Sequence, residues 1–343
     1  VSYTFKLASG TYTNAISIDR TTATQSFCIE GSGQDTTFIQ ANTSFALGGT
    51  SNALFFKDFK RVEIKNLCIR YGLYGAYIRD CDSTILQDVR FTNCGALGTV
   101  NRHDQTGTQA EQAAYWASSD TSSGGACRIR SVAEVQIRDC CADYCLRGFR
   151  VQDCGSIATA SIITGCRVFR VLESGIYLAA NTYTGSTGCT NVQIVGNTVQ
   201  EVFNNGILLI GGFGCTVQAN TVCRSASAGI QCWHTLDTRV IGNSLFDCNR
   251  LSHNGIGNDG DAFGNLVFDG SDLIQSSGTY IGSITNNCIL KAGQGRAAGV
   301  YGITLGESLD PYPTASNKVQ IDGNFTDAAT KLFNWNSTPV VSF

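Results

Sequence analysis

Short runs of alternating apolar and polar residues recur along the middle of the chain. In each run, two aliphatic residues enclose a small residue, an asparagine (once a cysteine) and a polar residue. The runs are ITGCRV (163–168), IVGNTV (194–199), VQANTV (217–222) and VIGNSL (240–245). Such alternation over a few residues predicts short β-strands, and no stretch sustains the period of a helix.

The runs return at a fixed interval. Asn197, Asn220 and Asn243 are each 23 residues apart, and a glycine begins a second apolar run seven positions after the closing aliphatic residue. These second runs are GIYL (175–178), GILL (206–209) and GIQC (229–232). A fixed period of this length is typical of stacked structural repeats. The sequence therefore predicts an all-β solenoid, a single-stranded parallel β-helix of about ten coils.

The composition suits strands joined by tight turns, and it argues against nucleic acid as a partner and against a membrane span. Only 15% of the residues are charged, there are 38 glycines and 3 prolines, and the formal net charge is −3. Without a basic run to neutralise phosphates, nucleic acid is not expected as a partner. No apolar stretch approaches the roughly 20 residues of a membrane-spanning helix. The chain does not begin with methionine, which indicates a processed or truncated start.

Sixteen cysteines permit disulfides, but several occupy equivalent positions of the repeat. Cys166 stands where the following coils carry asparagine, while Cys68 and Cys288 stand where Thr198 stands. A free thiol packs as a small apolar group, so we predict stacked, unpaired, buried cysteines. One or two disulfides are the alternative. No Cys-x-x-Cys pair is present, which argues against zinc.

The chain is predicted to be one β-helix domain over residues 1–343. Long insertions in solenoids form loops on one side and often build a binding surface. The predicted parts are first coils at 1–60, regular repeats at 61–325, insertions near 95–124, 256–278 and 306–317, and a C-terminal cap at 326–343.

The opening KLASGTYT (6–13), the asparagine-centred turns and the Gly-Ile-x-Leu strands resemble the right-handed parallel β-helix of the pectin-lyase-like superfamily. The resemblance covers about residues 5–325. Its members include pectate lyases, polygalacturonases, uronate epimerases and bacteriophage tailspike depolymerases. The pectinase motifs are not found, and the long lateral loops are most similar to those of tailspikes. The resemblance implies a homotrimer, outside the cell or on a virion surface, with a polysaccharide as partner.

A charged column emerges when the coils are aligned on the glycine: Arg170, Glu201, Arg224, Asp247 and Lys291. One interpretation is a surface ladder of alternating charges, each pair contributing well under ~1 kcal/mol. The other is catalytic, because Glu201 and Asp247 lie two coils apart, roughly 9–10 Å. Inverting glycosidases separate their carboxyls by ~6.5–9.5 Å.

Further residues complete these candidate sites. Glu173 is a third catalytic carboxylate in this interpretation, and Arg224 is expected to tune the acids and to bind substrate. The second choice of catalytic group is the loop NDGD (258–261), with Asp259, Asp261 and the nearby His253. The same loop is also ordinary turn chemistry. It lacks EF-hand spacing, so no cofactor is expected, with a bound calcium as the alternative.

Rings beside polar groups are typical of sugar-binding surfaces. The candidates for substrate binding are Tyr177, Trp233, His234, Tyr115 and Trp116. Packing in the core or anchoring of loops is the alternative for each. We predict an enzyme that cleaves a bacterial surface polysaccharide, by hydrolysis rather than β-elimination. The alternative is a non-catalytic fibre, adhesin or receptor-binding protein, which would need no converging carboxylates.

Overall fold

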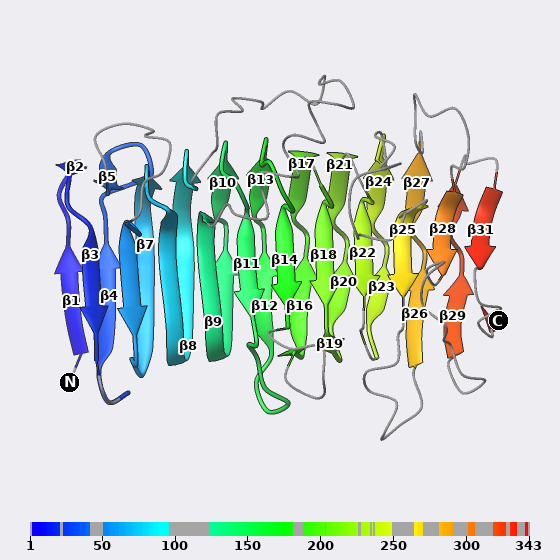
Figure 1. The fold of residues 1–343 in the computed structure, drawn as a ribbon, viewed down its shortest axis with the longest axis horizontal. Helices are drawn as coiled ribbons and strands as arrows, with labels where there is room; N and C mark the ends of the chain where they lie inside the picture. Colours follow the sequence, from blue (N-terminus) through cyan, green and yellow to red (C-terminus); the bar gives the residue numbers. More distant parts are fainter. Residues whose placement is uncertain are drawn as a thin grey trace.

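The computed structural model describes residues 2–20, 23–41, 51–95, 124–180, 188–202, 204–225, 228–233, 235, 237–248, 264–269, 281–290, 301–305, 318–326, 330–334 and 340–341. These residues form one solenoid whose coils follow each other along the long axis, from the N-terminus to the C-terminus (Figure 1). Every strand pairing within it is parallel. The predicted all-β parallel β-helix is confirmed.

Three faces run the length of the solenoid, and each coil contributes one strand to each face. Face I consists of β1 (Ser2–Lys6), β4 (Ser26–Glu30), part of β7 (Arg61–Arg70), β8 (Tyr74–Thr92) and β9 (Gly125–Arg138), β12 (Ser161–Thr164), β16 (Val192–Val195), β20 (Thr216–Gln218), β23 (Arg239–Ile241), β26 (Ile281–Thr285), β29 (Lys318–Asp322) and β32 (Val340–Val341).

Face II follows face I in each coil. It consists of β2 (Gly10–Tyr12), β5 (Thr37–Gln40), the last parts of β7 and β8, β10 (Cys141–Asp143), β13 (Arg167–Phe169), β17 (Thr198–Val202), β21 (Thr221–Ser225), β24 (Ser244–Phe246), β27 (Cys288–Leu290) and β30 (Phe325–Thr326).

Face III closes the coil. It consists of β3 (Ile16–Asp19), β6 (Leu54–Lys57), the first parts of β8 and β9, β11 (Phe149–Gln152), β14 (Ile176–Ala179), β18 (Ile207–Ile210), β22 (Ile230–Trp233), β25 (Gly264–Asp269), β28 (Tyr301–Leu305) and β31 (Thr330–Asn334). A separate small sheet pairs β15 (Cys189–Thr190) with β19 (Gly212–Phe213).

Two segments differ from the predicted organisation. Residues 264–269, assigned from the sequence to a lateral insertion, form β25 and pair with β22 and β28 on face III. The run NLVF within them is rich in residues that favour strands. Likewise β31 and β32 continue the coils within the predicted cap. The remaining parts of the three predicted insertions lie almost entirely outside the described residues.

At most corners of the coil, one residue adopts positive φ and the next faces the interior. Between faces I and II the positive-φ residues include Asn66, Asp88, Asp139, Gly165, Gly196 and Gly242. Glycine, asparagine and aspartate tolerate this left-handed conformation best. A single residue of this kind turns the chain sharply enough to begin the next face, so the corners need no long loops.

The residue that follows this corner forms the predicted asparagine ladder. The Nδ2 of Asn220 donates to the carbonyl of Ile194 at 2.9 Å, and its Oδ1 accepts from the backbone N–H and the Nδ2 of Asn197, each at 2.9 Å. Asn243 repeats the same bonds one coil further on. The strand register stacks Thr198 on Thr221 and Thr221 on Ser244. The predicted stacking of the three asparagines is confirmed.

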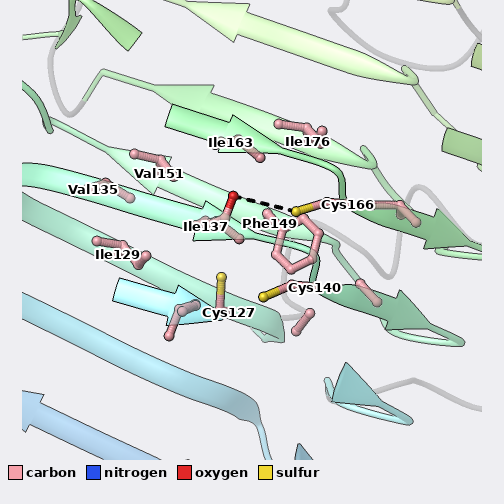
Figure 2. Packing of buried hydrophobic residues seen from close by; sticks show 14 of the residues in the cluster. Cys127, Ile129, Val135, Ile137, Cys140, Phe149, Val151, Ile163, Cys166 and Ile176 are labelled. Carbon is pink, nitrogen blue, oxygen red and sulfur yellow. Dashed lines mark hydrogen bonds between the residues drawn. The ribbon is translucent and has the colours of Figure 1, made fainter. Parts of the chain in front are cut away.

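Cysteine replaces asparagine in this role. The thiol of Cys166 donates to the carbonyl of Ile137 at 3.6 Å, as Figure 2 shows, and this carbonyl is the counterpart of the one that Asn197 reaches. Cys94, Cys154 and Cys248 make the same contact at the other corners. None of the sixteen cysteines forms a disulfide, and twelve of them are buried. The prediction of free, buried thiols is confirmed.

The glycine that precedes β11, β14 and β18 on face III is required by the close approach of coils. A Cβ on Gly148 would lie 1.9 Å from the carbonyl oxygen of Gly175. On Gly175 it would lie 2.7 Å from that of Gly206, and on Gly206 2.6 Å from that of Gly229. Any side chain would therefore push the neighbouring coil away, and this explains the recurrence of glycine in the repeat.

Asn220→Ala is expected to lower the free energy of unfolding by about 3 kcal/mol or more. The change leaves the carbonyl of Ile194 and the donors of Asn197 buried without partners, at ~1–3 kcal/mol for each group. Urea unfolding followed by circular dichroism measures the loss. The control is Gln218→Ala, which removes an exposed side chain of the same coil. Equal stability of the two variants would contradict a stabilising ladder.

Burial also makes stability depend on alkaline pH. Burial raises the pKa of the thiols of Cys81, Cys215 and Cys248 from an ordinary 9.0 to about 11, and of Cys68 and Cys154 to about 12. A raised pKa in the folded state means that the stabilisation is complete below pH 9.0 and is lost as pH rises toward 12.

Thermal unfolding should therefore show a Tm that falls above about pH 9. Cys154→Ala should lower Tm at neutral pH through its cavity and make the alkaline decline shallower. Titration of the denatured, unreduced protein should find all sixteen thiols reactive. Six or more disulfides, or a Tm that is flat above pH 9 in the wild type, would show that the thiols are not stacked as described.

Candidate functional site

The predicted charged column lies at the corner between faces II and III. Arg170, Glu201, Arg224 and Asp247 all have positive φ, between 52° and 59°. Nε of Arg170 donates to Oε2 of Glu201 at 2.7 Å, and Nη1 of Arg224 donates to Oε1 of the same carboxylate at 3.4 Å. Nε of Arg224 lies 3.7 Å from Oδ2 of Asp247. Charges of alternating sign thus pair from coil to coil.

Arg224 therefore bridges Glu201 and Asp247. The catalytic interpretation requires a water between these carboxyls, whereas in the structure the guanidinium of Arg224 contacts both. The ion-pair distances correspond to the alternative interpretation, a ladder of alternating charges. The catalytic roles of Glu201 and Asp247 stay a prediction that depends on displacing Arg224.

Glu173 follows the same corner but points to a different partner. Arg147 of the preceding coil holds it with two hydrogen bonds, one from Nη2 to Oε1 at 2.7 Å and one from Nε to Oε2. The two side chains are only 15% and 12% exposed, so the pair is poorly screened by solvent. A bidentate pair of this kind fixes both the position and the orientation of the carboxylate. It stands directly before face III.

Face III carries outward side chains that alignment of the repeats did not find together. Phe55, Tyr77, Arg128, Arg150 and Tyr177 stand opposite one another in five successive coils. We name these five residues the arginine–aromatic column. All five are half-buried. The ring centroids of Phe55 and Tyr77 are 5.5 Å apart.

The two arginines lie against the rings of the column. The guanidinium carbon of Arg128 is 5.2 Å from the ring centroid of Tyr77, and that of Arg150 is 5.2 Å from the ring centroid of Tyr177. These distances are typical of cation–π contacts. Burial lowers the pKa of Arg150, and the neighbouring Arg128 and Arg147 lower it further, whereas Tyr177 opposes them. Arg150 thus lies in a partly desolvated, cationic environment.

Neutral amides flank the column. Nη2 of Arg128 donates to Oε1 of Gln152 at 2.8 Å, and Nδ2 of Asn205 donates to Oε1 of Gln231 at 2.9 Å. Gln152, Asn205 and Gln231 are buried, and Oδ1 of Asn205 has no hydrogen-bond partner among the described residues. Amides both donate and accept. Face III thus carries half-buried rings and cations with buried amides beside them.

Of the predicted substrate-binding residues, the structure brings Tyr177 into this surface and Arg224 into the charge ladder. Trp233 ends β22, where its backbone pairs with Ile210 and Asp269, and its side chain lies outside the description. Also outside the described residues are the other predicted candidates, His234, Tyr115, Trp116, His253, Asp259 and Asp261.

Sequence reasoning missed Arg128 and Arg150. Both alternate with buried residues, in CRIR (127–130) and GFRV (148–151), and this alternation was the feature of the sequence that could have placed them on the outer surface.

In the part of the chain that is described, no group of three or more His, Cys, Asp or Glu residues could hold a metal ion. Across those same residues no helix is long and apolar enough to cross a membrane.

The family described as "Right handed beta helix region" matches residues 27–245, which is more than half of the chain. The chain belongs to this family, and the predicted right-handed parallel β-helix is confirmed. No curated protein matches the chain by sequence.

Among solved structures, the A-module of the mannuronan C-5 epimerase AlgE6 from Azotobacter vinelandii is similar, with a TM-score of 0.55 and 12% identity over 100% of this chain and 91% of that chain. The catalytic unit of a GH87 α-1,3-glucanase from Streptomyces thermodiastaticus gives 0.39 at 14% identity, over 99% of this chain and 64% of that one. An N-terminal fragment of bacteriophage Phi29 gene product 12 gives 0.40 at 9%, over 98% and 66%. At these identities the likeness concerns the fold.

Proposed function

We propose that this protein is carbohydrate-active and binds an extracellular polysaccharide along face III of its central coils. The arginine–aromatic column carries the proposal. Rings such as those of Tyr77 and Tyr177 supply apolar area for sugar rings together with a polar hydroxyl. The amides of Gln152 and Gln231 lie beside them at the same face. Because the column crosses successive coils, it suits an extended chain rather than a single small ligand.

A polysaccharide substrate is in keeping with the fold of the family. The AlgE6 A-module, which resembles the chain over its full length, is described as acting on mannuronan. The fold alone hosts many activities, so the argument for sugar binding rests on the side chains of face III. The proposal includes the extracellular or virion-surface setting and the homotrimer that the tailspike resemblance implies, and light scattering tests the trimer.

For the reaction we propose hydrolysis by the corner acids. Glu201 and Asp247 are held by Arg224, and Glu173 is held by Arg147. A substrate that carries its own anionic groups would draw these arginines away and leave the carboxylates beside the sugar chain. One acid would then protonate the leaving oxygen while the other activates water. The anionic groups of the substrate would therefore free Glu201 and Asp247 from Arg224, and Glu173 from Arg147.

Glu201→Gln or Asp247→Asn is expected to lower turnover by ~10²-fold or more while the fold persists. Capsular and acidic polysaccharides form the panel, with new reducing ends as the readout for hydrolysis. Ultraviolet absorbance detects unsaturated products of elimination, and proton NMR detects a change of sugar configuration without cleavage. Arg239→Gln on face I is the control, since it changes a charge remote from this corner.

A second function follows if binding occurs without any chemical change. The observation that favours it is that each of the three acids is engaged by an arginine in the structure. The protein would then be a non-catalytic receptor-binding or fibre protein that uses the same face. If Glu201→Gln and Asp247→Asn both keep full activity, these two acids are not catalytic. The charged column of Arg170, Glu201, Arg224 and Asp247 is then a surface charge ladder.

A further inference from the structure

Two arginines of the arginine–aromatic column face each other, and no carboxylate of the described residues pairs with either. Arg128 and Arg150 are direct partners in the pairing of β9 with β11. The hydrogen-bond partner of Arg128 is the neutral amide of Gln152, and the contact of Arg150 is the ring of Tyr177. Other arginines nearby have acids: Arg79 with Asp80, Arg90 with Asp143, Arg147 with Glu173 and Arg170 with Glu201.

This arrangement is unfavourable for the protein by itself. Like charges directly opposite on neighbouring strands repel each other, and arginine is seldom buried unless it is paired. Nε of Arg128 and Nε of Arg150 are both buried and have no hydrogen-bond partner within the described part of the chain. The tyrosine rings offset part of the charge, but they provide no acceptor for these N–H groups. The pair therefore lacks an anionic acceptor.

We propose that Arg128 and Arg150 form a subsite for the carboxylate of an acidic sugar; this rests on the proposed function. The planar carboxylate has two oxygens that match the forked donors of a guanidinium. Tyr77 stands one coil before the arginines and Tyr177 one coil after them. The rings of the sugars on either side of the carboxylate would lie against these tyrosines. The subsite thus selects uronate-type residues over neutral sugars.

Stability separates a ligand-binding role from a structural one. Arg150→Met keeps an unbranched apolar side chain that replaces most of the aliphatic stem, and it removes a half-buried charge that has no acid partner among the described residues. Replacing such a charge by an apolar group is often neutral or stabilising. The variant is therefore expected to unfold at the same Tm as the wild type or at a higher one. A structural arginine would lower Tm when replaced.

The experiment is calorimetric titration with short oligomers of mannuronate, guluronate and galacturonate, and with the same oligomers after chemical reduction of their carboxyls. The wild type should bind at least one acidic oligomer tenfold or more tightly than its reduced form, in keeping with ~1.5–3 kcal/mol for a charged hydrogen bond. Arg150→Met should lose most of this preference and bind both forms alike. Arg239→Gln should behave as the wild type.

The outcomes are distinct. Binding that ignores carboxyl reduction and Arg150→Met overturns the subsite while the proposed function stands. Binding of a free uronate monosaccharide that Arg150→Met abolishes, without binding of oligomers, supports the subsite and overturns the proposed function. No binding of any probe overturns both. Preference for sulfated or phosphorylated oligomers over all carboxylated ones overturns the assignment to a carboxylate.

Discussion

The spacing of about one strand between coils is the constraint on which the rest of this structure depends. Each coil must lie directly on the previous one, so that every backbone group on its three faces finds a partner. Many corners therefore turn on one left-handed residue, and an Asn or Cys that follows it can reach the carbonyl of the coil below. Asn220 and Cys166 both meet this requirement, through an amide and a thiol that reach equivalent carbonyls. The choice between them is local chemistry within the same geometry.

The same spacing builds the surface chemistry. Because the register is kept from coil to coil, outward side chains at one position stack into columns, and their interactions become those of neighbours. At the corner between faces II and III this gives pairs of opposite charge, from Arg170 to Asp247. On face III it gives arginines between tyrosine rings, with no acid paired to them among the described residues. The contrast separates the corner, where charges pair within the solenoid, from face III, where we propose that a ligand supplies the anion.

The repeat made the fold predictable, but only in part of the chain. Between residues 192 and 250 the corner asparagine marks each coil. Earlier coils place Leu67, Val89 and Cys140 at the corresponding positions. Without the asparagine as a marker, the strands that contain Arg128 and Arg150 could not be aligned with Tyr177. The sequence did not predict β25 for a related reason: the turn before Gly264 is longer than in the preceding coils. The apolar run of β25 is therefore far from the position that the repeat predicts, and it looks like part of a loop.

The sequence by itself determined the class of fold, the stacking of the asparagines and the free, buried state of the cysteines. Each of these follows from residues that recur at equivalent positions, because residues one repeat apart in the sequence lie next to each other in adjacent coils of a solenoid. Only the tertiary structure decided which charges are paired. Glu173 meets Arg147 across 26 residues, and Arg150 meets no carboxylate among the residues that the structure describes. Which charged side chains pair depends on the direction and burial of each side chain at irregular corners. The spacing of repeats along the sequence does not specify either property.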